Sequence, residues 1–294
     1  MQRRIKKYFL NFFNKIINLP SVRYMLKQMS QVSPYFYLGD HRALIKTIYG
    51  HKMIIDTRDI SLAPHLVVDG YWEGWVTEAF ITQLKEGMHV IDIGANFGYY
   101  TLIAASKVGK NGKVYSFEAD PEIAEVLFLN VEINGFLDRV KVINKAVYNT
   151  SQKIQFKKLI KHRGSSSIFM KESTAKQFKD KIETIEVETC SLDDFLLAEK
   201  NPRIDLIKID AEGSEPFIFE GMQSLISQNQ TLTIISEFAP AFFFGIGKDP
   251  KQFLKTLIEI GFKVCHIDID GKIKQIDIDG LLKLEWTMLY LKKD

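Results

Sequence analysis

Acidic residues stand at the ends of four apolar runs that have the composition of buried strands. These acids are Asp92, Glu118, Asp210 and Glu237. Carboxylates in such a row could bind ribose hydroxyls, pair with an ammonium group, take up a proton or hold a divalent cation. One acid at the end of a strand is weak evidence, but four of them form a pattern. The pattern predicts a ligand site along one edge of a sheet.

The turn after the first of these acids narrows the choice of ligand. In the run IDIGANFG, Gly94 and Gly98 are four positions apart. A dinucleotide site uses G-x-G-x-x-G, whose second and third small residues would fall on Asn96 and Tyr99. Both side chains are too large for that role. The spacing instead suits a ligand with an amino acid end, whose ammonium Asp92 would meet and whose carboxylate the loop amides would meet.

The second acid adds a sugar to this ligand. Glu118 ends the run VYSF, in the range where folds of this kind place an acid that binds ribose hydroxyls. Together with Asp92 it predicts S-adenosylmethionine, which has a ribose but no pyrophosphate. The predicted cofactor-binding residues are Glu78, Asp92, Gly94, Ala95, Asn96, Gly98, Glu118, Ala119, Ala146 and Asp210.

Two of these predictions have an equally good structural explanation. The segment GYWEGWVTE ends at Glu78 and also contains Glu73. Its acids and aromatic rings could line the mouth of a pocket, but packing against the sheet would explain the rings as well. Ala146 follows the third predicted strand on the side where adenine should lie, and an ordinary loop there is equally consistent.

The run IDLIKIDAEGSE supplies the predicted reactive groups. It has the form of a fourth parallel strand that delivers Asp210 to the carboxyl edge, with Glu212 two residues further on. With Glu237 after the fifth strand, these acids are the predicted catalytic residues, which could orient an acceptor and take its proton. The same three could hold a divalent ion such as Mg²⁺. The alternative is that Glu212 and Ser214 cap the next helix.

The elements that must position these residues alternate between strand and helix. Helical patterns over Tyr99 to Val108, Pro121 to Asn134 and Pro250 to Ile260 separate the strand-like runs. The predicted fold is therefore α/β: a Rossmann-like sheet of seven mostly parallel strands, the last antiparallel, with helices on both faces. Residues 71–294 form this domain, and residues 1–70 form an extension and cap. An added hairpin around residues 163–168 could be a substrate lid or a surface excursion.

Composition limits the remaining possibilities. The chain has 294 residues, 46% of them hydrophobic, and a net charge of +3, so it makes no electrostatic case for nucleic acid. Cys190 and Cys265 are far apart in apolar runs, which predicts buried, reduced thiols and a reducing cytoplasm. No apolar run reaches the roughly 18 residues of a membrane span.

The first residues carry a separate pattern. Apolar residues recur at helical spacing over residues 2–19, between lysines and arginines. This basic helix could lie on the inner membrane surface, or it could pack on the domain or on a second subunit of an oligomer.

Residues 73–237 resemble the FkbM family of S-adenosylmethionine-dependent methyltransferases. The blocks that carry the resemblance are VIDIGANFGYYT (90–101), FEADP (117–121), SLDDF (191–195) and IKIDAEGSE (207–215). The first two are shared widely among such methyltransferases, and the last two are more particular to the family. The resemblance implies methyl transfer to oxygen, often a hydroxyl of a sugar, glycan or secondary metabolite. The first 50 or so residues and those after 237 match less clearly, so acceptor choice is expected there.

Two alternatives come from other classes of protein. A methyltransferase acting on base amino groups commonly carries Asn/Asp-Pro-Pro-aromatic after its fourth strand, whereas this chain has DAEG at residues 210–213. A protein methyltransferase belongs to the same alternative. A non-catalytic module would dock on a membrane or a partner through residues 2–19. Neither explains the ribose acid and the later acids as well as an enzyme with a small-molecule or glycan acceptor does.

Overall fold

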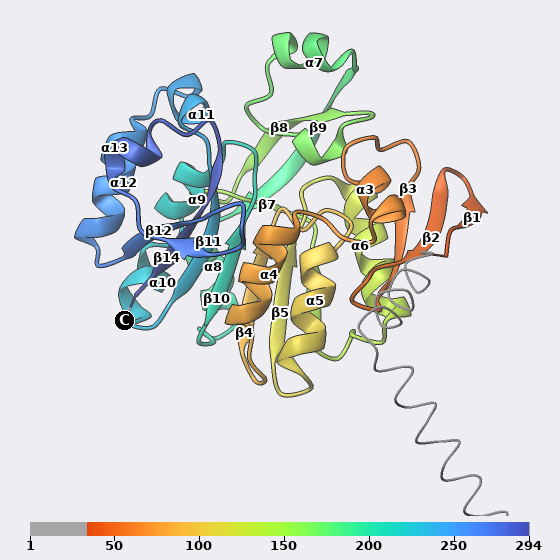
Figure 1. Cartoon of the computed structure of the whole chain (residues 1–294), viewed down its shortest axis with the longest axis horizontal. Coiled ribbons are helices and arrows are strands. Elements are labelled where there is room, and N and C mark those ends of the chain that lie inside the picture. Colours follow the sequence, from red (N-terminus) through yellow and green to blue (C-terminus); the bar gives the residue numbers. More distant parts are fainter. Residues whose placement is uncertain (1–33, 294) are drawn as a thin grey trace, which may run out of the picture.

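The structure is a computed structural model that describes residues 34–293. Its centre is an eight-stranded sheet in the order β13-β12-β14-β11-β10-β4-β5-β6 (Figure 1). The strands are β4 (His89–Ile93), β5 (Lys113–Phe117), β6 (Val140–Ile143), β10 (Leu206–Ile209), β11 (Thr233–Phe238), β12 (Lys263–Ile267), β13 (Ile273–Lys274) and β14 (Thr287–Lys292). Strands β6, β5, β4, β10 and β11 are parallel, and β14 runs antiparallel between β11 and β12. The predicted Rossmann-like sheet with an antiparallel last strand is confirmed, and the short β13 adds an eighth strand to the seven predicted.

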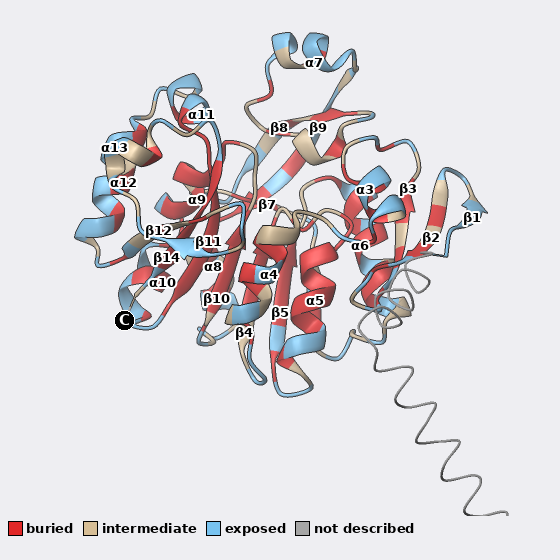
Figure 2. Ribbon diagram, viewed as in Figure 1, coloured by how far each residue is buried: buried red, intermediate tan, exposed pale blue. Residues whose placement is uncertain are grey.

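Helices cover both faces of the sheet because successive strand residues point to opposite sides. Val90 belongs to one hydrophobic core and its neighbour Ile91 to the other. Figure 2 shows the central strands buried between the helices. The first core contains α4 (Gly74–Gln83), α5 (Tyr99–Val108) and α6 (Pro121–Ile133); the second contains α8 (Leu192–Ala198), α9 (Glu215–Glu220), α10 (Gln223–Gln228) and α12 (Pro250–Glu259).

Capping residues and close backbone contacts fix where these helices begin and end. Helix α6 begins at Pro121, and the preceding Asp120 accepts a hydrogen bond from the Glu122 amide at 2.9 Å. The chain after Gly213 forms two short helices, α9 and α10. A side chain at Gly221, between them, would lie 2.2 Å from the Tyr148 carbonyl oxygen, so the chain passes too close there for any residue but glycine.

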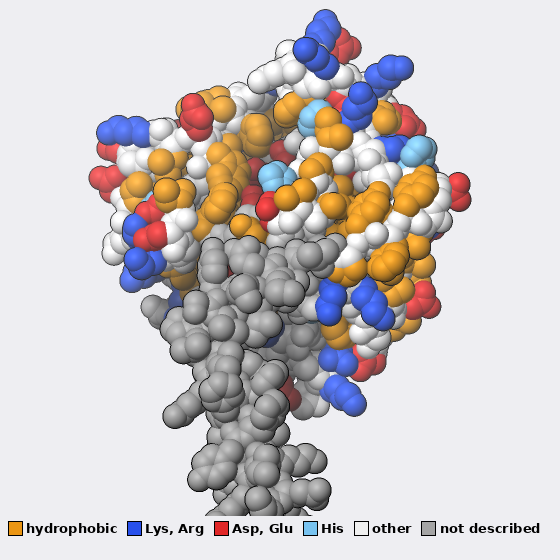
Figure 3. All heavy atoms as spheres, turned by 45° about the vertical axis from the view of Figure 1, so that its right-hand side comes forward, with side chains coloured by type: hydrophobic (Ala, Val, Ile, Leu, Met, Phe, Trp, Pro, Cys, Tyr) orange, Lys and Arg blue, Asp and Glu red, His pale blue; other side chains and the backbone are white. Residues whose placement is uncertain are grey.

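A small antiparallel sheet of β1 (Phe36–Gly39), β2 (Arg42–Lys46) and β3 (Lys52–Asp56), followed by α3 (Ala63–Val68), precedes the main domain. The Asn130 side chain of α6 bonds the backbone of Ile54 in β3 at both its amide and its carbonyl, which joins this sheet to the domain. The edge strand β1 and the residue before it expose four hydrophobic side chains: Tyr35, Phe36, Tyr37 and Leu38. Figure 3 shows hydrophobic side chains gathered on the right of the molecule, the side on which β1 lies in Figure 1. The predicted helix at 2–19 lies outside the described residues. A domain boundary at residue 70 stays a prediction.

The predicted hairpin is present and follows β6 in the chain. Strands β8 (Lys153–Leu159) and β9 (Ile182–Cys190) pair antiparallel, and the short β7 (Ala146–Val147) joins them. Between β8 and β9 lie the 3₁₀ turn η1 (Arg163–Ser165) and α7 (Glu172–Phe178). The two remaining helices, α11 (Pro240–Gly245) and α13 (Ile278–Leu281), lie near the end of the chain.

Two predictions from composition can be compared with the described residues. Cys190 and Cys265 are buried and form no disulfide, as predicted. Within residues 34–293, no helix combines the length and the apolar character that crossing a bilayer requires. The compartment of the protein stays a prediction.

Candidate active site

The carboxyl ends of β4, β5 and β10 open onto one cavity. Its lining includes six of the predicted cofactor residues: Gly94, Asn96, Glu118, Ala119, Ala146 and Asp210. An adjoining cavity of about 220 Å³ shares Gly94, Asn96 and Asp210 with it and adds Ala95. The sequence therefore predicted correctly that these residues share one edge of the sheet.

Glu118 is held ready to bind a ligand through its carboxylate. Its Oε2 accepts a hydrogen bond from the Asn96 amide and its Oε1 one from the Asp120 amide, both at 2.9 Å. Burial raises the pKa of Glu118 to about 7, although these amides oppose the shift. Each oxygen keeps a lone pair for another donor. The side chain thus fits the two hydroxyls of a ribose, which is the feature that an adenosyl cofactor would present.

The two glycines of the turn have different roles. Both have positive φ, 75° at Gly94 and 94° at Gly98. A side chain at Gly94 would lie 1.8 Å from the Asp210 carbonyl oxygen, so this glycine lets the turn pass against β10 beside the cavity. A side chain at Gly98 would instead lie 2.5 Å from Leu127 of α6. Gly98 does not line either cavity, and its contact with a cofactor stays a prediction. Its lack of a side chain serves the packing of α5 against α6.

Asp92 lies behind the wall of the cavity. Its side chain has no exposed surface, and its Oδ2 accepts a hydrogen bond from Thr101 Oγ1 at 2.6 Å. Asp92 lines neither cavity, and its Oδ1 is buried without a hydrogen-bond partner in residues 34–293. Direct contact between Asp92 and an ammonium group stays a prediction. Burial raises the pKa of Asp92, and Lys208 and Thr101 oppose the shift.

Lys208 is the functional residue that the prediction missed. It is 1% exposed and lies directly opposite Asp92 in the parallel pairing of β10 with β4. Its Nζ donates to Asp210 Oδ2 at 2.9 Å and lies 4.3 Å from the centre of the Tyr100 ring. Burial works against its charge, but Asp210, Asp92 and Glu73 raise its pKa above the ordinary value. Lys208 is thus a buried cation that links the acids of the cavity to the acid beneath it.

Glu73, and not the predicted Glu78, lines the site. Glu78 is exposed on α4, where it accepts a hydrogen bond from the Tyr49 hydroxyl at 3.0 Å, so its predicted cofactor contact is wrong. Glu73 lines the 220 Å³ cavity and accepts from the Tyr100 hydroxyl at 3.2 Å. Burial, together with the charge of Asp210, raises its pKa to about 7. The two acids are five residues apart on a helix start, and spacing alone could not show which faced inward.

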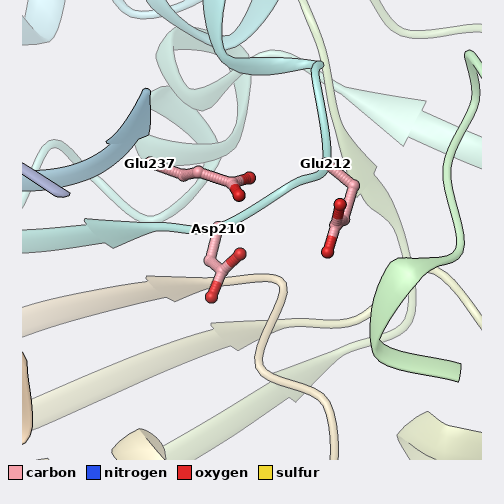
Figure 4. A group of neighbouring side chains, drawn as sticks. All are labelled: Asp210, Glu212 and Glu237. Carbon is pink, nitrogen blue, oxygen red and sulfur yellow. The ribbon is translucent and has the colours of Figure 1, made fainter. Parts of the chain in front are cut away.

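The three predicted catalytic acids meet at the same edge. One carboxylate oxygen from each of Asp210, Glu212 and Glu237 lies within 4.8 Å of the others (Figure 4). Asp210 and Glu212 follow β10, and Glu237 lies near the end of the adjacent β11. All three also line the 220 Å³ cavity. The structure therefore confirms that they form one group, and their catalytic roles stay predictions.

The backbone holds Glu212 in an unfavourable conformation. Its φ is 49°, in the left-handed region that residues with a side chain seldom adopt. The predicted alternative, in which Glu212 and Ser214 cap the next helix, is wrong: Ser214 makes no side-chain cap, and Glu215 instead accepts from the amides of Ala211 and Gly213. Such strain is common where a side chain must face a ligand.

Burial and neighbouring acids raise the pKa of Glu212 and of Glu237. Burial, followed by the charges of Asp210 and Glu215, raises the pKa of Glu212 well above its ordinary value. Burial and the charges of Glu212 and Asp210 do the same for Glu237, against a hydrogen bond from Trp286. Glu212 and Glu237 therefore hold a proton more readily than free carboxyl groups do.

A third, more apolar cavity borders the acids. Its volume is about 440 Å³, and its lining includes Glu212 and Glu237 together with aromatic rings: Phe169, Phe178, Phe242 and Trp286. Trp286 Nε1 donates to Glu237 Oε1 at 2.7 Å. Glu118 does not line this cavity. Trp286 is a residue that no motif indicated.

The predicted lid segment borders two cavities: the cofactor cavity, which is the one lined by Glu118, and the aromatic cavity. Gly164 lines the cofactor cavity and Ser167 the aromatic one, and Ser167 Oγ donates to the Glu212 carbonyl oxygen at 2.6 Å. The buried Arg163 fixes the segment to α6, with Nη2 3.0 Å from Glu122 and Nη1 3.4 Å from Asp120. The segment is therefore part of the site wall, and the alternative of a plain surface excursion does not hold.

Comparison with known proteins places the chain in a family. Residues 92–264, more than half of the chain, match the model of the methyltransferase FkbM domain. The protein-L-isoaspartate O-methyltransferase of Hyperthermus butylicus is 38% identical over 88 residues, which are 28% of this chain and 33% of that protein. Methyltransferase sdnD of Sordaria araneosa is 26% identical over 165 residues, 48% of this chain and 63% of that protein. The chain thus spans less than two thirds of the length of either relative.

Solved structures show a more distant likeness. An S-adenosylmethionine-dependent O-methyltransferase from Thermotoga maritima has a TM-score of 0.40 at 17% identity, covering 85% of this chain and 77% of that one. An O-methyltransferase from Bacillus cereus, in complex with S-adenosylhomocysteine, has a TM-score of 0.42 at 15% identity, covering 81% and 83%.

The sheet topology defines a Rossmann-like α/β fold. The match to the family model shows that the chain belongs to the FkbM methyltransferase family.

Proposed function

We propose that the protein transfers a methyl group from S-adenosylmethionine to a hydroxyl oxygen of a sugar, glycan or secondary metabolite. The observation that carries this proposal is the position of Glu212 and Glu237, which line both the cavity next to Gly94 and the aromatic cavity. A donor bound on one side and an acceptor on the other would meet at these acids.

Bound S-adenosylmethionine would supply an electrophilic methyl group, so the protein has mainly to align the acceptor. Glu118 would fix the ribose, and the loop beside Gly94 would fix the amino acid end. Asp210, paired with Lys208, carries a negative charge next to Glu212 and Glu237. One of these three would orient the acceptor hydroxyl and receive its proton.

The aromatic cavity suits an acceptor with an apolar face. A volume of about 440 Å³ is in the range of small-molecule sites. Rings such as Phe242 and Trp286 can pack on the carbon-bound hydrogens of a sugar ring or on an apolar metabolite, while the adjacent carboxylates accept from its hydroxyls.

The same charges disfavour a carboxylate acceptor, which is what the name protein-L-isoaspartate O-methyltransferase implies for the relatives. Two ionised carboxylates about 5 Å apart repel by about 3 kcal/mol at an effective dielectric constant of about 20. In the absence of a bound cation, three ionised acids at the acceptor position would therefore disfavour a further anion, including the phosphates of a nucleic acid. A hydroxyl carries no charge and avoids this cost.

The test is to incubate the protein with S-adenosylmethionine that carries a ¹³C-methyl group and with fractionated metabolites and glycans. We expect a product whose methyl carbon has the NMR shift of an ether and which survives mild base. A base-labile methyl ester would show a carboxylate acceptor, and an N-methyl shift would show an amine; either result would contradict the proposal.

A further inference from the structure

Three carboxylates converge where β10 and β11 end, with little around them to balance their charge. Figure 4 shows Asp210, Glu212 and Glu237 directed toward a common space, and one oxygen of each lies within 4.8 Å of the other two. Carboxylates this close repel one another strongly in a buried site. The arrangement is therefore unfavourable unless a cation or shared protons lie among them.

The lysine of the site balances only part of this charge. Lys208 Nζ contacts Asp210 Oδ2 at 2.9 Å, and no other ion pair of residues 34–293 reaches the three acids. The contact is with one oxygen, so Asp210 can still offer the other. When all three acids are ionised, the group keeps two negative charges in excess, because one lysine faces three carboxylates.

An unpartnered atom gives independent support for a ligand. Glu237 is 6% exposed, and its Oε1 accepts the hydrogen bond from Trp286, whereas its Oε2 is fully buried without any hydrogen-bond partner in the described chain. Buried carboxylate oxygens are rarely left unpaired. The bond to Trp286 fixes the side chain, and one oxygen of this carboxylate lies within 4.8 Å of an oxygen of Asp210 and of Glu212.

We propose that Asp210, Glu212 and Glu237 bind a hard divalent cation of the Mg²⁺ or Mn²⁺ class. Three carboxylate oxygens without histidine or cysteine are the ligands that such ions prefer. The shared 220 Å³ cavity leaves room for water or an acceptor oxygen in the remaining coordination positions. The proposal rests on the proposed function only where it assigns an acceptor oxygen to the cavity. Cation binding itself needs no turnover.

The experiment uses Mn²⁺ as the probe on the full chain, with electron paramagnetic resonance to measure free Mn²⁺ at constant ionic strength. We expect saturable binding of one ion, which excess Mg²⁺ displaces. Glu237→Gln, which keeps the shape of the side chain and an acceptor for Trp286, should weaken binding at least tenfold, and Asp210→Asn should do the same. Glu78→Gln, which changes an exposed acid outside the group, should bind as the wild type does.

Circular dichroism of each variant shows whether it folds, and if Asp210→Asn does not, Glu212→Gln replaces it. Absence of saturable Mn²⁺ binding, or equal affinity in the wild type and Glu237→Gln, would overturn the proposal. If methyl transfer proceeds while no Mn²⁺ binds, the cation site is refuted and the proposed function stands. If Mn²⁺ binds as expected and the ¹³C experiment yields no ether, the proposed function fails while the cation site is supported.

Discussion

The candidate site has two halves: a cofactor half, which is the cavity around Glu118, and an acceptor half, which is the aromatic cavity around Glu237 and Trp286. The two halves are built in different ways. In the cofactor half, Glu118 is held by backbone amides of Asn96 and Asp120, which are close to it in the fold and belong to contiguous motifs. In the acceptor half, Glu237 is held by the side chain of Trp286, 49 residues away, and faces two other acids. In the cofactor half, nearby backbone amides thus stabilise the carboxylate, whereas the acceptor half brings together acids from separate elements.

This difference shows which half is stable by itself and which half needs a bound ligand to balance its charge. Amides around a carboxylate satisfy it without a cation, so the cofactor half can be stable before any ligand binds. The acceptor half keeps unsatisfied charge that only a proton, a cation or a substrate can relieve. Substitutions in the two halves should therefore separate cofactor binding from turnover.

The largest expected effect is on turnover in the acceptor half. Glu237→Gln should lower kcat by about 100-fold to 10,000-fold, because it removes a proton acceptor next to the methyl donor. Affinity for S-adenosylhomocysteine should change less than about threefold, since Glu237 does not line the cavity beside Glu118. The measurement pairs turnover on the methylated acceptor fraction with calorimetry. Retained turnover would remove Glu237 from the catalytic group, and Glu220→Gln is the exposed control.

The next effect concerns the lysine that joins the two halves. Lys208→Met should reduce the free energy of unfolding by about 3–5 kcal/mol, because Asp92 and Asp210 then lose their buried cation. Adding Asp92→Asn should recover part of that loss. Urea unfolding measures both variants.

An exposed pair provides the control for this cycle. Lys248→Met breaks the surface pair with Glu220 and should cost less than about 1 kcal/mol. Equal losses for Lys208→Met and Lys248→Met would mean that the buried lysine does not balance the acids.

A smaller effect is expected for cofactor affinity. Glu118→Ala should weaken S-adenosylhomocysteine binding about 100-fold, or about 3 kcal/mol, if the carboxylate accepts from both ribose hydroxyls. Glu125→Ala, an exposed acid on α6 paired with Arg42, should leave affinity unchanged. Unchanged affinity in Glu118→Ala would exclude Glu118 as the ribose residue.

The smallest effect is on pH dependence. The pKa of Glu118 is raised to about 7, so the carboxylate that accepts ribose hydroxyls is lost as pH falls through that value. S-adenosylhomocysteine affinity should therefore fall about tenfold between about pH 8 and about pH 6. Glu118→Gln should bind more weakly at the higher pH and lose most of this dependence. A pH profile that is the same in both proteins would assign the titration to another group.

The sequence predicted the cofactor half well because its signals are local. A strand, a glycine turn and a helix start lie within a few residues of one another, and Glu118 ends the next strand. Asp92 and Gly98 do not line the cavities, and the reason is the direction in which each residue faces. Asp92 shares its face with Val90, which packs under the first set of helices, so alternation along the strand already placed it away from the second core.

The acceptor half was predicted only in part. The acids after β10 and β11 could be found because parallel strands end at one edge, but Trp286 comes from the antiparallel end of the chain and carries no motif. Lys208 did leave a signal, a lysine between two isoleucines in a strand buried on both faces. Such a lysine must pair with buried acids, and parallel register places it opposite Asp92.

The central claim is that one crevice presents the sugar of the cofactor to Glu118 and its reactive end to the three acids. A crystal structure of the protein with S-adenosylhomocysteine tests it most directly. We predict both ribose hydroxyls within hydrogen-bonding distance of Glu118 and the sulfur directed toward Asp210, Glu212 and Glu237. A nucleoside bound elsewhere, or a sulfur directed away from these acids, would contradict the account.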